Sequence, residues 1–249
     1  MNSQQAAQLL IAARIKGPTA SWRDIVPAER GGAYAIQDAT LAAIGPAAGW
    51  KVGAKDSHAE PHCAPLPASG IHASGVTLRG SAWRWRCVEV EVAFRLGRDL
   101  DPKGKLLAPA ELAEAFDAVL PVVEVVESRL LDGQAADPLA QLADLQCHGA
   151  LVLGSPSAFA PAQLDLRTAE ASLDFGTTSA AHTRGGNPAQ DVWRLLSWLA
   201  LHCAQRGQPL RTGQIVTTGS CIGLLPAPLD TTVRGEIAGV GAVELRFER

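Results

Sequence analysis

Two glutamates one residue apart, Glu89 and Glu91, constrain this chain more than any other feature. They alternate with valines between residues 88 and 92, a pattern typical of a β-strand. Residues i and i+2 of a strand leave the same face, with Cα atoms about 6 to 7 Å apart. Two carboxylates held so close raise each other's pKa unless a cation lies between them or water reaches both. The plainer alternative is a half-exposed strand with both glutamates in water.

A third glutamate, Glu124, favours a cation between the carboxylates over a half-exposed strand. It lies among valines that occupy both faces of the run 119–126, so this strand is expected to be buried on both sides. A buried carboxylate without a partner is costly, this run contains no lysine, and Arg129 belongs to the opposite face by strand parity. Three converging carboxylates suit a hard divalent cation, Mg²⁺ first and Mn²⁺ next.

Composition excludes several classes of function. The chain has 249 residues, of which 47 % are hydrophobic, enough for one elaborate domain with a helical lead-in. A net charge of -3 with scattered Lys and Arg argues against nucleic acid as a partner, and the run Trp83-Arg84-Trp85-Arg86 is interpreted as a strand with alternating faces. No apolar run reaches membrane-spanning length and no signal peptide is recognisable. Five cysteines without CxxC spacing fit reduced thiols, so we expect a cytoplasmic protein.

The order of predicted elements indicates an α+β protein with a mostly antiparallel β core. Residues 1–48 are predicted to form an N-terminal helical region and residues 49–249 a β-rich domain with peripheral helices. Ser3 is the expected cap of the first helix, and Gly17-Pro18 its stop. The predicted helices cover residues 3–16, 27–44, 109–119 and 190–205. The predicted strands cover 49–53, 88–94, 119–126, 215–218, 231–237 and 242–247, and a Pro- and Gly-rich loop covers 56–75.

Five motifs follow one another in an order that is similar to a known family. The series resembles the 2-keto-4-pentenoate hydratase and 2-oxo-hex-3-enedioate decarboxylase family, within the fumarylacetoacetate hydrolase superfamily, over nearly the whole chain. The motifs are Gly49-Trp50-Lys51-Val52-Gly53; Glu89-x-Glu91 followed by Phe94-x-Leu96-Gly97-Arg98-Asp99-Leu100; Pro121-x-x-Glu124-x-x-x-Ser128-Arg129; Gly186-Asn187-Pro188; and Leu210-Arg211-Thr212-Gly213-Gln214-Ile215-Val216-Thr217-Thr218-Gly219-Ser220.

The resemblance implies a fold, a cofactor and a class of reaction. It implies a rolled β core, a homo-oligomer that can associate with a related decarboxylase or hydratase, and Mg²⁺ held by Glu89, Glu91 and Glu124. The implied activity is that of a lyase in aromatic compound catabolism, which hydrates a small 2-hydroxydienoate through an enolate at the metal. Decarboxylation of a 2-oxo-enedioate, carbon-carbon hydrolysis of an acylpyruvate, and a non-catalytic partner subunit remain open.

Lys51, His58 and Glu60 are expected to act on the substrate rather than to bind the metal. Lys51 is expected to hold the substrate's carboxylate or enolate as a cation, or to shuttle protons if burial lowers its pKa; the alternative is a lysine that reaches from a strand edge into water. His58 and Glu60 are the expected acid/base pair, on a lid formed by the 56–75 loop, as in related carbon-carbon hydrolases.

Five further residues are predicted to bind substrate. The turn after the strand at 215–218 offers hydroxyls and a backbone N–H to a carboxylate. Where the compared hydratases carry an Asp-Asn-x-Ser-like stretch, this chain has Asp144-Leu145-Gln146-Cys147, which predicts a drier far end of the pocket, with Cys147 as a small core residue. For Arg129, pairing with nearby acids is the alternative. The predicted substrate-binding residues are Thr218, Gly219, Ser220, Asp144 and Arg129.

Overall fold

Helices form one end of the molecule and one of its faces. The computed structural model describes residues 1–17, 19–131 and 133–249; the Pro18 part of the predicted helix stop lies outside them. Ser3 was the expected cap of the first helix, but the side chain of Asn2 accepts the hydrogen bond of the Gln5 N–H, so Ser3 is already helical. The helices are α1 (Ser3–Lys16), α2 (Trp22–Ile25), α3 (Arg30–Ile44), α4 (Pro109–Ala113), α5 (Pro138–Ala143) and α6 (Val192–Gln205).

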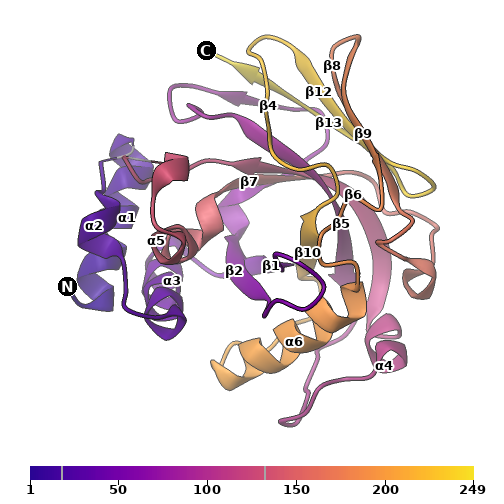
Figure 1. Cartoon of the computed structure of the whole chain (residues 1–249), viewed down its shortest axis with the longest axis horizontal. Coiled ribbons are helices and arrows are strands. Elements are labelled where there is room, and N and C mark those ends of the chain that lie inside the picture. Colours follow the sequence, from indigo (N-terminus) through magenta and orange to yellow (C-terminus); the bar gives the residue numbers. More distant parts are fainter. Residues whose placement is uncertain (18, 132) are drawn as a thin grey trace.

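The larger sheet forms the centre of the molecule (Figure 1). Its strand order is β2-β1-β10-β5-β6-β7-β3, with β11 paired to β5, and its pairs are antiparallel except β1 with β10 and β3 with β7. Its strands are β1 (Ala47–Gly53), β2 (His62–Pro67), β3 (Ile71–Ala73), β5 (Cys87–Leu96), β6 (Phe116–Val126), β7 (His148–Leu153), β10 (Ile215–Ser220) and β11 (Leu225–Pro226).

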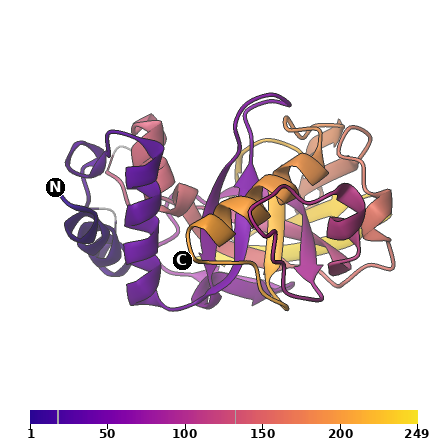
Figure 2. The same ribbon diagram turned by 90° about the horizontal axis from the view of Figure 1, so that it is seen from below.

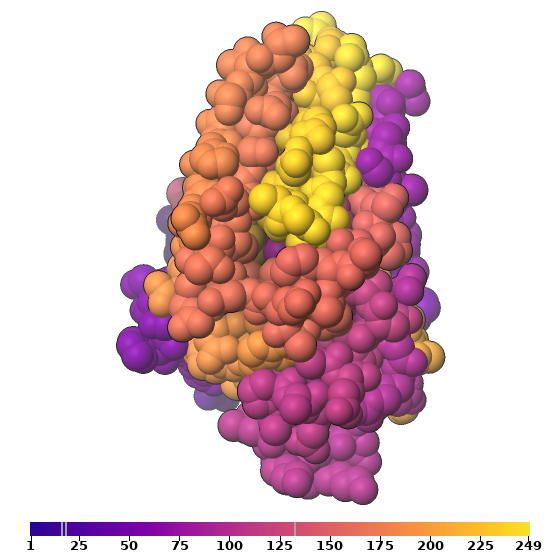
Figure 3. Space-filling model, turned by 90° about the vertical axis from the view of Figure 1, so that its right-hand side faces the viewer, coloured from indigo at the N-terminus to yellow at the C-terminus, as the bar shows by residue number. Residues whose placement is uncertain are grey.

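The smaller sheet covers one side of the larger one. Figure 3 views the molecule from this side, where β8 and β9, in orange, lie beside the yellow C-terminal strands. The order is β4-β13-β12-β8-β9, antiparallel except for β13 with β4, so the prediction of a mostly antiparallel core is confirmed. The strands are β4 (Val76–Arg79), β8 (Glu170–Phe175), β9 (Thr178–Arg184), β12 (Thr232–Ile237) and β13 (Gly241–Glu248).

The alternation of β5 and β6 separates an apolar face from an acidic one. Val90 and Val123 are fully buried and point toward the smaller sheet, where Gly235 of β12 packs against them. A Cβ on Gly235 would lie 2.8 Å from a Val90 methyl, so only glycine lets the two sheets approach this closely. By strand parity, Glu89 and Glu91 leave the other face of β5.

The helices enclose this acidic face. α3 packs against α1, α5 and β2 at one end of the larger sheet, and α6 lies along β1 and β10 (Figure 2). One apolar cluster runs from Ala6 of α1 to Phe247 of β13, so the N-terminal helices and both sheets share a core. None of the described helices is both long and apolar enough to cross a membrane.

Four sequence-based predictions of helices, strands and loops were wrong, in their bounds or entirely. The predicted helix 109–119 ends at Ala113, because from Phe116 onward the chain pairs with β5. The predicted 56–75 loop contains β2 and β3, so only residues 54–61 lack helix or strand before β2. The predicted strand at Trp83–Arg86 is a turn, since Arg86 has φ 48° and donates to the carbonyls of Trp83 and Arg84. The predicted helix 27–44 begins at Arg30, after the short α2.

Candidate metal centre and substrate cavity

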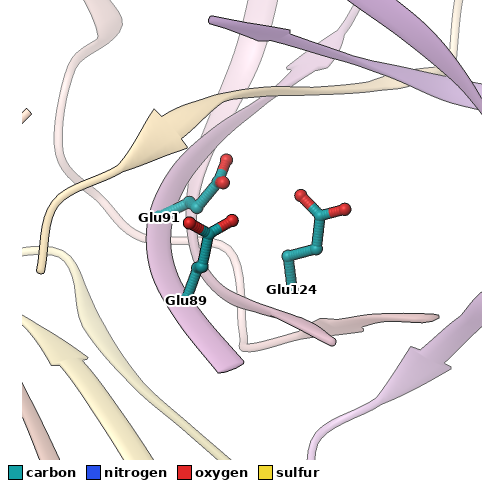
Figure 4. Close-up of side chains that lie close together, drawn as sticks. All are labelled: Glu89, Glu91 and Glu124. Carbon is teal, nitrogen blue, oxygen red and sulfur yellow. The ribbon is translucent and has the colours of Figure 1, made fainter. Parts of the chain in front are cut away.

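Three glutamates converge on one space, as the strand pattern predicts. Glu89 and Glu91 project from β5 on the same side, and Glu124 of β6 is the direct cross-strand neighbour of Glu89 (Figure 4). One carboxylate oxygen from each lies within 4.8 Å of the others. Glu91 and Glu124 are buried, with exposed fractions of 1 % and 0 %. The alternative of a strand with its glutamates in water is therefore wrong.

Burial and mutual repulsion disfavour the charged forms of two of these glutamates. Burial, then the charge of Glu124, raises the pKa of Glu89 to about 7. Burial, then the charges of Glu124 and Glu89, raises the pKa of Glu91 to about 8. Without a cation between them, these groups hold protons near neutral pH, which is the condition that a divalent ion would relieve.

Glu124 has partners that sequence reasoning did not find. Its Oε1 accepts from the Lys51 ammonium and lies 3.2 Å from Nδ1 of His148, while its Oε2 is buried without a hydrogen-bond partner among the described residues. Burial raises the pKa of Glu124, but Lys51 and His148 outweigh burial and the net pKa is lowered. Lys51 is far from Glu124 in the sequence, and the order of strands in the larger sheet brings β1 close to Glu124 of β6.

Lys51 is held in its charged form. Burial alone lowers its pKa, yet the attraction of Glu124, Glu89 and Glu91 outweighs burial and the net pKa is raised. Its Nζ also donates to the carbonyl oxygen of Gln146 at 3.2 Å. The alternative of a lysine that reaches into water does not hold, because the side chain is only 12 % exposed. The raised pKa favours the predicted role of a fixed cation over that of a proton shuttle.

The centre opens into a cavity of about 510 Å³, called the main cavity below. Strands β1, β5 and β10 supply Lys51, Glu89, Glu91 and the turn at residues 218–220, so the structure brings most predicted site residues together. The lining residues are Lys51, Val52, Gly53, Ala54, His62, Cys63, Trp85, Glu89, Glu91, Val126, Gln134, Gln141, Gln146, Cys147, Gly186, Asn187, Pro188, Thr218, Gly219, Ser220, Gly223 and Leu224.

The turn predicted at residues 218–220 is an irregular end of β10, where the pairing with β5 shifts register, and it lines the main cavity with its polar groups already engaged. The Gly219 N–H donates to Oε2 of Glu91 at 2.9 Å, and the Thr218 hydroxyl donates to the carbonyl of Val92 at 3.0 Å. Buried Asn187 donates its amide to the carbonyls of Thr218 and Gly219. Gly219 has φ +87°, a conformation that favours glycine, so this turn is built to deliver its N–H to Glu91.

Arg129 and Asp144 lie behind the main cavity wall and pair with each other. The Arg129 Nε donates to Asp144 Oδ1 at 2.5 Å, and its Nη atoms donate to the carbonyls of Asp144 and His148, each at 2.7 Å. These two carbonyls bracket the residues 145–147. Arg129 therefore pairs with a nearby acid, which was the alternative to substrate binding. Neither Arg129 nor Asp144 lines the main cavity.

The bracketed turn is strained. Leu145, Gln146 and Cys147 have φ of 49°, 52° and 56°, in the left-handed region that costs a non-glycine residue about 1 kcal/mol or more. In this conformation the Gln146 carbonyl accepts from Lys51, and Gln146 and Cys147 lie in the main cavity wall. Leu145 is fully buried. The predicted apolar character of this stretch therefore reaches the main cavity through Cys147.

His58 and Glu60 lie outside the main cavity. Both are exposed, and Glu60 forms an ion pair with Arg30 at 2.9 Å. Arg194 of α6 donates to the carbonyls of Asp56 and Ala59, which ties the segment 54–61 to the helix. The neighbouring His62 does line the main cavity, and burial, then the charges of Lys51 and Arg30, lowers its pKa to about 4.

Some lining residues were not predicted. Gln146 and Trp85 were visible in the sequence only as neighbours of other motifs, because their positions depend on the irregular backbone before β7 and β5. His148, which contacts Glu124 but does not line the main cavity, was visible only as a neighbour of Cys147. Asn187 carried a signal, since Gly186-Asn187-Pro188 is one of the five motifs.

Comparison with known proteins places the chain in a family. Residues 43–248 match the family described as fumarylacetoacetate (FAA) hydrolase C-terminal. The TodF product hydratase of Pseudomonas putida is 33 % identical over 167 residues, which cover 65 % of this chain and 59 % of that protein. The 2-keto-4-pentenoate hydratase of Paraburkholderia xenovorans is 32 % identical over 165 residues, which cover 65 % and 58 %. The matched part is thus under two thirds of these relatives' length.

Solved structures share the fold. The 4-oxalocrotonate decarboxylase from Pseudomonas putida G7, complexed with magnesium and adipate, superposes with a TM-score of 0.85 at 20 % identity, covering 98 % of this chain and 97 % of that one. At this identity the likeness establishes the architecture, including the expected core of β-sheets with peripheral helices. With the family match over residues 43–248, it shows that the chain belongs to the fumarylacetoacetate hydrolase family.

Proposed function

We propose that the chain is a Mg²⁺-dependent hydro-lyase that adds water to a small 2-hydroxydienoate. The observation that carries the proposal is the cluster of Glu89, Glu91 and Glu124, with oxygens within 4.8 Å of one another, in the wall of a cavity of about 510 Å³ beside a charged lysine. Relatives named 2-keto-4-pentenoate hydratase support the reaction.

The residues present fit Mg²⁺, and Mn²⁺ as a second choice. The candidate ligands are carboxylate oxygens, which hard cations prefer, and the Oε2 of Glu124 is buried with no other partner. A magnesium-bound fold neighbour supports the same assignment. Mg²⁺, when bound by Glu89, Glu91 and Glu124, would polarise the C2 oxygen of a 2-oxo or 2-hydroxydienoic acid.

Lys51 and the 218–220 turn would organise the substrate around that centre. The Lys51 ammonium, fixed by Glu124 and Gln146, is the cation available to the substrate's carboxylate or C2 oxygen. The Gly219 N–H keeps Glu91 oriented, so this turn acts mainly by positioning a carboxylate. His58 and Glu60 remain our proposed acid/base pair, and this role requires the segment 54–61 to leave its contacts with Arg30 and Arg194.

Decarboxylation of a 2-oxo-enedioate is the second candidate. Cys147 and Val126 give the main cavity an apolar wall, where an attacking water would lose hydrogen bonds worth about 1 kcal/mol each, whereas loss of CO₂ needs no such water. Carbon-carbon hydrolysis of an acylpyruvate would need the same water. A homo-oligomer, with or without a related enzyme, remains part of the proposal and is measurable by light scattering.

The decisive experiment separates metal binding, enolisation and hydration. Purified protein with Mg²⁺ should consume 2-hydroxypenta-2,4-dienoate, seen as loss of its ultraviolet absorbance, and EDTA should stop the reaction. NMR in D₂O should show exchange of the C3 protons of pyruvate under the same conditions. Absence of exchange for a panel of 2-oxo acids, in protein that binds Mg²⁺, would exclude the enolate mechanism. Absence of Mg²⁺ binding would instead favour a non-catalytic partner subunit.

A further inference from the structure

A second hollow, of about 490 Å³, shares lining residues with the main cavity; we call it the outer hollow. Trp85, Gln134 and Leu224 line both spaces, so they form the boundary where one passes into the other. None of the three glutamates borders the outer hollow. Its lining residues are Trp85, Cys87, Leu131, Gly133, Gln134, Leu224 and Pro226.

Trp85 is a fixed part of this boundary. Its backbone N–H donates to Glu127 Oε2 at 2.9 Å, and its ring packs against the apolar cluster of Cys87, Val126 and Cys147. A Cβ on Gly133 would lie 1.7 Å from the Trp85 ring, so the indole rests directly on the Gly133 backbone. Cys147, Val126, Trp85 and Leu224 therefore provide an apolar surface from the main cavity outward.

The two spaces offer little to a second negative charge. Among the described lining residues, Lys51 and His62 are the basic side chains of the main cavity, and the outer hollow has none. Lys51 already pairs with Glu124, and the Gln134 amide donates to Cys87 Sγ at 3.8 Å. A carboxylate placed against Trp85 and Leu224 would lose water without gaining a cation.

We propose that this site selects substrates with an uncharged, apolar tail, and that Trp85 and Leu224 hold the tail in the outer hollow. The inference rests on the proposed function and narrows its substrate class to monocarboxylic dienoates, against the dicarboxylates that a decarboxylase would take. Leu131 and Leu224, 57 % and 40 % exposed, are large apolar side chains that such a tail would cover. Each buried methylene should tighten binding about threefold to fourfold.

The test measures binding of stable 2-oxo acids to the Mg²⁺-loaded protein by calorimetry. Pyruvate, 2-oxopentanoate and 2-oxohexanoate form a series of growing apolar tails, and 2-oxoadipate carries a carboxylate on a chain of the same six carbons. We expect affinity to rise along the series and 2-oxohexanoate to bind at least about tenfold tighter than 2-oxoadipate. Equal affinity for these two acids would overturn the proposal.

A matched pair of variants locates the effect. Leu224→Arg should invert the preference toward 2-oxoadipate, because the new guanidinium pairs with the second carboxylate. Leu106→Arg makes the same change at a leucine that is 62 % exposed and borders neither space, and should keep the parent's preference. Identical behaviour of the two variants would refute the placement of the tail.

Failure of the tail inference and failure of the proposed function give different results. If pyruvate itself does not bind in the presence of Mg²⁺, the metal centre and the tail inference fall together. If pyruvate binds but tail length has no effect, only the tail inference falls.

Discussion

Glu124 is the residue on which the candidate site depends most. It faces Glu89 across the strand pair and accepts from Lys51, so it takes part in the acidic cluster and in a buried ion pair at once. Burial, together with negative charge that Lys51 neutralises only in part, raises the pKa values of Glu89 and Glu91 to about 7 and 8. With all three carboxylates ionised, the cluster and Lys51 carry a net charge of −2, which a divalent cation would balance.

The first prediction concerns the three glutamates. Glu89→Gln, Glu91→Gln and Glu124→Gln should each weaken Mg²⁺ binding at least about tenfold, or roughly 1.4 kcal/mol, because each removes one charged ligand. Calorimetric titration of Mg²⁺ measures the change. Glu244→Gln, on the smaller sheet, is the control and should bind as the parent does. Parent-like binding by all three cluster variants would show that the metal site is misplaced.

The second prediction separates the structural role of Lys51 from its role toward substrate. Lys51→Met should lower the free energy of unfolding of the EDTA-treated protein by about 3 kcal/mol, because it leaves buried Glu124 without its cation. Added Mg²⁺ should raise the free energy of unfolding of Lys51→Met by more than it raises that of the parent, whereas turnover by the variant should stay low. Urea denaturation with and without Mg²⁺ measures the first effect.

The double variant Lys51→Met with Glu124→Gln is the control for this prediction. It removes both charges and should lose less stability in EDTA than Lys51→Met alone. If Lys51→Met is as stable as the parent in EDTA, Glu124 does not depend on the lysine for its charge.

At the scale of elements, the turn between α5 and β7 contains three successive left-handed residues, of which Gln146 and Cys147 line the main cavity. Arg129 donates to the carbonyls at both ends of this turn and to the Asp144 carboxylate. Arg129→Met should therefore cost about 3 to 5 kcal/mol, because Asp144 is left charged and buried while the turn loses its bracket. Urea denaturation measures this loss.

An exposed pair provides the comparison for Arg129. Arg95 and Asp117 lie 2.7 Å apart with side chains 39 % and 48 % exposed, so Arg95→Met should cost less than about 1 kcal/mol. Equal losses for the Arg129 and Arg95 variants would contradict the bracketing role. Combining Arg129→Met with Asp144→Leu should recover part of the stability, since the Asp144 carboxylate is then no longer buried without the Arg129 guanidinium.

Regular elements were more predictable than the segments between them. The apolar spacing of α6 and the alternation of β5 predicted these elements within two residues, because each pattern extends over many positions. The predicted helix 109–119 was wrong past Ala113, since pairing with β5 overrides helical spacing there. β2 was missed because its two prolines argue against a strand, and β3 was missed because three residues are too few to show an alternation.

At the scale of the whole molecule, the candidate site joins strands that are far apart in the chain. Glu89, Glu91 and Glu124 could be grouped from sequence, because adjacent antiparallel strands carry them on one face. The pairing of Lys51 with Glu124 could not be predicted from sequence, since β10 and β5 lie between β1 and β6 in the sheet. The alternation of residues along one strand predicts which side chains share a face of the sheet. Contacts across intervening strands follow only from the complete order of strands.

This assembly makes the stability of the whole molecule depend on pH and Mg²⁺ together. The ordinary pKa of a glutamate is near 4.5, but in the metal-free folded protein the pKa values of Glu89 and Glu91 are about 7 and about 8. The folded state thus binds more protons than the unfolded state across this range. The stabilising contribution of these protons is complete below about pH 4.5 and is lost as pH rises through 7 and 8.

Mg²⁺ should reverse this dependence, because it competes with the same protons. We expect Mg²⁺ affinity to rise about tenfold from pH 7 to 8, where Glu91 alone must lose its proton, and more steeply below pH 7, where Glu89 must lose one as well. Thermal denaturation in EDTA should then show a falling Tm from pH 6 to 8.5, while the Tm gain from Mg²⁺ grows. The Glu89→Gln and Glu91→Gln double variant should lose both trends. Mg²⁺ affinity that is constant between pH 6 and 8 would mean that the two carboxylates are already ionised in the metal-free folded protein.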